Sequence, residues 1–313
     1  MTDLPGRSCP IRYRYGAPAL ASAPTREAQT LYVVGGLYGN LQALDTIEAL
    51  AAQESGPVTV CFNGDFNWFN VDNASFEAIN QRVLVHHAIA GNVEAELLAD
   101  SDESGCGCAY PDHVDAGVVA RSNRIHARLK ATAARHPHIQ AWLATLPLFA
   151  RYQVGDCRVA VVHGDADSLA GWRFDLNALT DPAQEPWLVA CFHQAQADVF
   201  ASSHTCQPVL RQLMKHHQTP VVINNGAAGM PNLRDHRAGI ITRIGTQPSP
   251  HPPLYGTRTA GVHIDALAVD YDHTLFERAF LANWPSGSDA HTSYFKRIQG
   301  ALALQVTQVF SAF

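Results

Sequence analysis

Short apolar runs that each stop at a polar, glycine-bearing cluster constrain this chain more than any other feature. Residues 31–34 stop at Gly35-Gly36, and residues 58–62 stop at Asn63-Gly64-Asp65. Apolar runs of about four to eight residues between turn residues are typical of buried strands. Asn40 then opens an amphipathic helix with Leu41, Leu44, Ile47 and Leu50 on one face. The pattern predicts an α/β fold with polar groups at the strand ends, where such sheets place their sites.

The same pattern continues along the chain. Further strands are expected at 83–90, 148–154, 158–162, 198–201, 220–223, 239–244 and 261–269. Helices are expected around 115–135, at 138–146 and from Thr274 onward. We interpret residues 1–28, rich in Pro, Ala and Gly, as an N-terminal arm and 29–313 as a single domain, with a loop and helical insertion at about 100–146.

Composition excludes several classes of protein. Lys+Arg number 22 against Asp+Glu 28, a net charge of -6, which gives no electrostatic footprint for nucleic acid or an anionic membrane. No apolar run approaches the roughly 18 residues of a membrane span, and the first residues lack the apolar stretch of a secretory signal. Seven cysteines, thinly spread over 313 residues, favour a cytoplasmic location and argue against a disulfide scaffold.

Five polar clusters follow predicted strands in a fixed order. They are GGLYGN (35–40), NGD (63–65), GNVE (91–94), VHGD (162–165) and SSHTC (202–206). Their order and framing resemble the calcineurin-like metallophosphoesterases, whose series reads Asp-x-His, Gly-Asp-x-x-Asp, Gly-Asn-His-Glu/Asp, His and Gly-His-x-His. The stretch 39–44, GNLQAL, also follows that family's first motif, and the resemblance covers about residues 30–270. It implies a four-layer sandwich of two mixed β-sheets flanked by helices.

This chain keeps only some of the metal-ligand positions of the family that it resembles. The family's first-motif Asp and His fall on Gly36 and Tyr38, its third-motif His on Val93 and its last His on Cys206. Four ligand positions are retained, namely Asp65, Asn92, His163 and His204. Carried over by position, these four complete one metal site, with Asp65 as the bridging-type ligand, while the ligands exclusive to the other site are lost. One carboxylate, one amide oxygen and two imidazoles suit a single divalent transition metal such as Zn, Fe or Mn.

The resemblance implies a divergent metal-dependent phosphoesterase that acts on a small phosphate ester, a diester more than a monoester, with hydroxide on a single metal as nucleophile. A lone ion cannot clamp both the attacking and the leaving oxygen, and Val93 replaces the third-motif imidazole, so we expect weak activity. The alternative is a non-catalytic binding or scaffolding protein with a protein partner, as the retromer subunit of this fold shows. A thiol-dependent redox or metal-handling role is a third hypothesis.

Three cysteines bear on that third hypothesis. Cys106 and Cys108 lie in a glycine-rich loop after the third motif, and Cys206 occupies a former ligand position. Together with Tyr38 they are possible replacement ligands for a soft metal. We favour the simpler interpretation, in which Cys106 and Cys108 are loop thiols and Cys206 is a small buried filler. On that interpretation, replacing Cys106 and Cys108 by Ser leaves metal content and folding unchanged.

Overall fold

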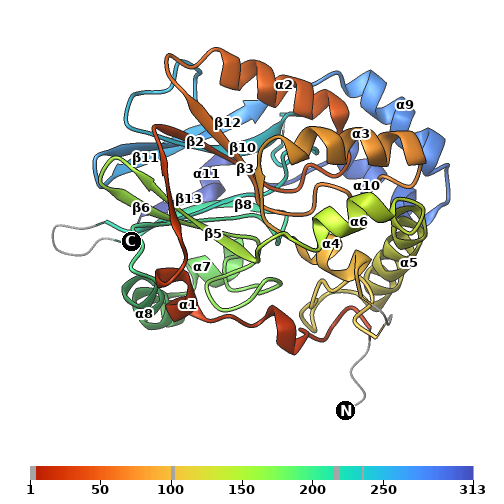
Figure 1. The fold of residues 1–313 in the computed structure, drawn as a ribbon, viewed down its shortest axis with the longest axis horizontal. Helices are drawn as coiled ribbons and strands as arrows, with labels where there is room; N and C mark the ends of the chain where they lie inside the picture. Colours follow the sequence, from red (N-terminus) through yellow and green to blue (C-terminus); the bar gives the residue numbers. More distant parts are fainter. Residues whose placement is uncertain (1–4, 100–102, 214–218, 235, 313) are drawn as a thin grey trace.

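The strands form two mixed sheets that pack face to face between helices (Figure 1). The structure, a computed structural model, describes residues 5–99, 103–213, 219–234 and 236–312. One sheet has the order β11-β12-β10-β2-β3-β4, with bounds Tyr255–Thr259, Val262–Val269, Gly239–Gly245, Thr30–Val34, Val58–Phe62 and His87–Ala88. In it, β2, β3 and β4 run parallel, whereas β10 pairs antiparallel with both β2 and β12.

The other sheet has seven strands in the order β1-β5-β6-β7-β9-β8-β13. Their bounds are Thr25–Ala28, Phe149–Val154, Cys157–Val162, Val199–Ser202, Val221–Asn225, Pro208–Gln212 and Phe310–Ala312. The central strands β6, β7 and β9 are parallel, so their carboxyl ends meet at one edge of the sheet.

Alternation along the strands builds three apolar layers. Leu31 and Val33 of β2 pack between the sheets with Val161 and Val199, whereas Tyr32 and Val34 face the helices on the outer side. That outer layer contains α2 (Leu41–Ala52), α3 (Asn73–Leu84), α5 (Ala116–Ala133), α6 (Pro137–Leu143), α9 (His273–Asn283) and α10 (Asp289–Ile298). On the opposite side, α1 (Ala17–Ala21), α7 (Leu176–Thr180) and α8 (Glu185–Ala195) cover the seven-stranded sheet (Figure 1). The predicted four-layer α/β sandwich is confirmed.

Most predicted elements lie where the sequence placed them, with one clear error. Asn40 caps α2 by accepting from the Ala43 N–H at 2.9 Å, and α5 and α6 lie where helices are predicted around 115–135 and at 138–146. That residues 100–146 form an insertion stays a prediction, and residues 100–102 lie outside the described part. The strand predicted over 83–90 is wrong, because only His87–Ala88 pairs with β3. Val83 instead lies in the last turn of α3, buried on the helix face that it shares with Phe76 and Ile79.

The predicted arm contributes structure of its own. Its last residues form β1, which pairs parallel with β5 at the edge of the seven-stranded sheet. The next strand, β2, belongs to the other sheet, so the predicted boundary at residue 28 lies where the chain passes from one sheet to the other. The division into arm and domain stays a prediction.

Candidate metal centre

Four polar side chains converge at the carboxyl ends of strands from both sheets. Asp65 follows β3, Asn92 opens α4 (Asn92–Leu97) after β4, His163 follows β6 and His204 follows β7. Gly64 has a φ of 95°, and a Cβ there would lie 2.5 Å from the backbone of Gly91, so glycine lets these two loops approach closely. The strand-end positions predicted from the sequence therefore bring these side chains together.

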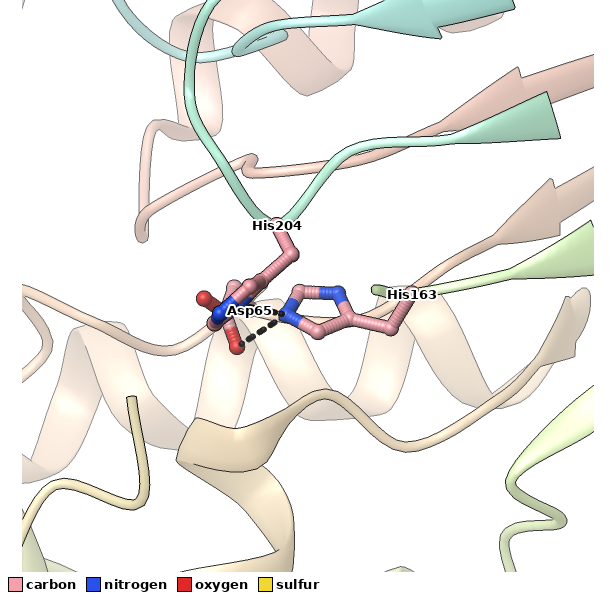
Figure 2. Close-up of side chains that lie close together, drawn as sticks. All are labelled: Asp65, His163 and His204. Atoms are coloured by element: carbon pink, nitrogen blue, oxygen red, sulfur yellow. Dashed lines mark hydrogen bonds and ion pairs between the residues drawn. The ribbon is translucent and has the colours of Figure 1, made fainter. Parts of the chain in front are cut away.

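The ligand atoms of Asp65, His163 and His204 all lie within 4.8 Å of one another, and all three residues are buried. Figure 2 shows the two imidazoles turned toward the carboxylate, with His163 Nε2 at 3.4 Å from Asp65 Oδ1 and 3.1 Å from His204 Nδ1. Asn92 Oδ1 lies 3.1 Å from the same nitrogen of His163. Among the described residues, this is the one group of His, Cys, Asp and Glu side chains found with such spacing, and it contains no cysteine.

The atoms of these side chains that point away from the centre are hydrogen-bonded to carbonyls, and these bonds determine which atoms facing the centre carry protons. His163 Nδ1 donates to the Asn63 carbonyl at 2.8 Å, and His204 Nε2 donates to the Cys108 carbonyl at 3.0 Å. The facing nitrogens of neutral rings are then unprotonated. The amide nitrogen of Asn92 donates to the Cys106 carbonyl at 2.8 Å, so its oxygen points inward.

When both rings are neutral, the atoms that face one another at this centre are all hydrogen-bond acceptors. Two imidazole lone pairs, an amide oxygen and a carboxylate repel one another unless a cation or a proton lies between them. Outer hydrogen bonds to backbone carbonyls are how metal-binding histidines are oriented in proteins. Asp65, Asn92, His163 and His204 thus fit a divalent transition metal such as Zn, Fe or Mn.

The charges at this centre act differently on the two imidazoles. Burial and the neighbouring His163 lower the pKa of His204 to about 3, so its ring is neutral near pH 7. Burial alone would raise the pKa of Asp65, but His163 and His204 bring it below its usual range, so the carboxyl is ionised. Burial alone would lower the pKa of His163, but the Asp65 carboxylate raises it above its usual value, so without a metal ion the proton held at this centre lies on His163.

Glu94, to which the sequence analysis gave no role, holds the Asp65 loop in place. Its Oε2 accepts from the N–H groups of Asp65 at 2.8 Å and Gly91 at 3.1 Å, and its Oε1 accepts from Phe66 at 3.1 Å and Asn67 at 3.3 Å. Burial and the charge of Asp65 raise the pKa of Glu94 to about 7, while these N–H groups act against them. Its position three residues after Gly91, as in a capping box, is the signal that could have found it.

Two of the positions that depart from the family pattern are filled by side chains that bond each other. The Tyr38 hydroxyl lies 2.6 Å from Cys206 Sγ, and the Tyr38 ring covers Gly36 so closely that a Cβ there would lie 2.9 Å from it. Val93 donates its backbone N–H to Asp65 Oδ1 at 3.2 Å. The structure thus brings Tyr38, Gly36 and Cys206 together, without forming a second cluster of ligands among the described residues.

Cys106 and Cys108 form a disulfide, so the expectation that they are loop thiols is wrong. Gly105 and Gly107, with φ of 57° and 67°, let the loop turn back on itself so that the two sulfur atoms meet. As a disulfide these sulfurs are not thiolate ligands. The main-chain carbonyls of the two residues accept from Asn92 and His204, and the Asn92 amide nitrogen also lies 3.4 Å from Cys108 Sγ.

A cavity of about 150 Å³ opens beside the centre. Asp65, Asn92 and His204 line it together with five aromatic side chains, Tyr38, Trp68, Tyr110, Trp172 and Tyr294. Trp172 also donates its indole N–H to the Cys108 carbonyl at 2.9 Å, the same oxygen that holds His204. Tyr110, Trp172 and Tyr294 belong to no motif in the sequence, and only the fold places them at the site.

Comparison with known proteins defines the class of fold. A metallophosphoesterase from Sphaerobacter thermophilus matches with a TM-score of 0.54 and 16% identity over 87% of this chain and 100% of that one. A hypothetical protein from Pyrococcus horikoshii OT3 matches with a TM-score of 0.56 and 17% identity over 84% of this chain and 96% of that one. No protein-family model and no curated protein matches the sequence.

The chain therefore has the calcineurin-like metallophosphoesterase fold, as the order of its motifs implied. Its buried Asp65, His163 and His204 could hold a metal ion. In the part of the chain that the structure describes, no helix has the length and apolar character needed to cross a membrane.

Proposed function

We propose that this protein is a metal-dependent phosphoesterase that works with one divalent ion on Asp65, Asn92, His163 and His204. The observation that carries the proposal is the pair of facing nitrogens of His163 and His204, 3.1 Å apart, each ring with its other nitrogen bonded to a carbonyl. With both rings neutral, this arrangement is unfavourable unless a metal ion or a proton lies between the two nitrogens. A protein that used this fold only as a scaffold would have no need to maintain it.

When bound, a divalent ion lowers the pKa of water and withdraws electron density from a phosphoryl oxygen. The residues of the chain then determine which ester is preferred. Asp65 offsets one of the ion's two positive charges, so the centre carries about one net charge and complements a monoanionic diester better than a dianionic monoester. Val93 offers no proton to a leaving group, which limits the rate.

A non-catalytic binding role is the alternative, and the test separates the two. The protein would be loaded with Zn, Mn or Fe(II) and assayed on bis(4-nitrophenyl) phosphate and 4-nitrophenyl phosphate. We expect slow, metal-dependent hydrolysis of the diester and less of the monoester. His163→Ala should abolish it, while His193→Ala, at an exposed histidine of α8, should not. A metal-loaded protein with no turnover on either ester would support the binding role instead.

A further inference from the structure

We propose that the cavity beside the metal centre binds one neutral aromatic ring, so that the substrate is a compact phosphodiester bearing an aryl group. This inference rests on the proposed function and names the substrate class of the same site. Three of the four proposed ligand residues line the cavity together with the five aromatic side chains. Any ligand that reaches the metal centre must therefore share this space with aromatic walls.

The size of the cavity limits the apolar group to one ring. Its volume is about 150 Å³, and a cavity of roughly that volume is known to accept a benzene molecule. A pair of stacked rings or a long acyl chain exceeds it. The group that fits is a single six-membered ring or one of similar size.

The residues that depart from the metal-binding pattern give the cavity its apolar character. Val93, Tyr38 and Cys206 all line it, each at a position where the family pattern has a polar imidazole. Tyr38 turns its hydroxyl to Cys206, Tyr110 lies 3.0 Å from the Ser122 hydroxyl, and Trp172 donates to the Cys108 carbonyl. Because these polar tips are already bonded within the protein, carbon surfaces remain to contact a ligand.

The aromatic walls are held by one another. Tyr110 packs on Trp172 with ring centroids 5.8 Å apart, and Trp68 packs edge-to-face on Tyr294 at 6.4 Å. The ring of Trp172 also stands edge-to-face to His204 at 5.2 Å. A wall braced in this way is formed before the ligand arrives, which lowers the entropy lost on binding.

Aromatic walls commonly bind either a neutral ring or a quaternary ammonium group, and the charge of this site decides between the two. Asp65 is the one acidic residue that lines the cavity. With a divalent ion beside it, the net charge there is positive and repels a cation. The aromatic walls and the positive centre together match a neutral ring attached to an anionic phosphoryl group.

Titration calorimetry of the metal-loaded protein with phenylphosphonate and methylphosphonate tests the inference without requiring turnover. We expect the phenyl compound to bind about tenfold more tightly, from burial of its ring. Quenching of tryptophan fluorescence should accompany it, because Trp68 and Trp172 line the cavity. Equal affinities, or tighter binding of 2-(trimethylammonio)ethylphosphonate than of phenylphosphonate, would overturn it.

A pair of matched variants tests whether the phenyl ring of the ligand binds in the cavity. Val93→Phe fills the cavity from a residue whose side chain is no proposed ligand, so the metal should remain and the preference for phenyl should fall to near unity. Val85→Phe, the same change at a residue 77% exposed, should keep the preference. If Val93→Phe fails to fold, Tyr294→Leu, which removes one wall, should reduce the preference by severalfold. A preference unaffected in the cavity variant that folds would overturn the inference.

The outcomes also separate this inference from the proposed function. Metal-dependent hydrolysis without a phenyl preference overturns the inference and leaves the function standing. A phenyl preference without any turnover overturns the function and, with it, the phosphodiester as substrate, while the binding of an aromatic ring in the cavity stands. Failure of both phosphonates to bind the metal-loaded protein contradicts both.

Discussion

The Tyr38 hydroxyl and the Cys206 sulfur lie 2.6 Å apart, at two positions where the family pattern has histidine ligands. Both side chains also line the aromatic cavity. The departures from the pattern are therefore packed together as a unit.

That packing predicts how the second metal position can be restored. Gly36→Asp alone should lower the free energy of unfolding by about 1–3 kcal/mol, because Gly36 has a φ of 63° and a Cβ would lie 2.9 Å from the Tyr38 ring. Combined with Tyr38→His, Val93→His and Cys206→His, it should bind a second ion and raise turnover. Urea denaturation and elemental analysis measure the two effects. A single variant as stable as wild type, or a quadruple variant with no second ion, would contradict this account.

The disulfide loop should tune metal affinity through its carbonyls. Because Cys106 and Cys108 present the carbonyl oxygens that accept from Asn92 and His204, the double change to Ser should weaken metal binding by about 10–100-fold, as loss of outer-shell partners does. This reverses the expectation from the sequence that the change has no effect. Competition with a chromogenic chelator measures it, and Cys191→Ser, in the α8 layer away from the centre, is the control. Identical affinities in the double variant and wild type would refute the role of the loop.

Glu94 should be a large contributor to stability near the centre. Glu94→Ala leaves four backbone N–H groups, those of Asp65, Phe66, Asn67 and Gly91, without their acceptor. We expect unfolding free energy to fall by about 3 kcal/mol or more, since each unsatisfied buried donor costs about 1–3 kcal/mol. Glu27→Ala, at an exposed position of β1, should change it by less than about 0.5 kcal/mol. Equal effects of the two substitutions in urea denaturation would show that Glu94 does not organise the loop.

Asp72 should account for part of the loss of folding stability in acid. It caps α3 by accepting from Ser75 N–H at 2.8 Å and also accepts from the Asn283 amide of α9 at 2.9 Å. Burial acts in the opposite direction, but these donors bring the pKa of Asp72 below its usual range. A lowered folded-state pKa stabilises the protein above the unfolded value of about 4, and that stabilisation is lost as pH falls through the folded value. Wild type should exceed Asp72→Asn in stability near pH 7, and the difference should shrink toward pH 3. A difference independent of pH would contradict it.

Site residues that directly follow a strand can be predicted from the sequence. Features formed where distant loops meet cannot. Asp65, His163 and His204 could be placed because each follows a recognisable apolar run, and such runs end at one edge of a sheet. The run at 83–90 misled because Val83, its first residue, also continues the buried helical face of α3, whereas Leu84 and Val85 are exposed. The aromatic cavity and the acceptor carbonyls of Cys106 and Cys108 were not foreseeable, since they depend on how separate loops and α10 fold against one another.

The central claim is that Asp65, Asn92, His163 and His204 hold one metal ion. Elemental analysis of the protein after loading with Zn, Mn or Fe(II) and desalting tests it most directly. The account predicts about one ion per chain, lost in His163→Ala and in His204→Ala and kept in His193→Ala. Two ions per chain, or an unchanged content in the two ligand variants, would contradict it.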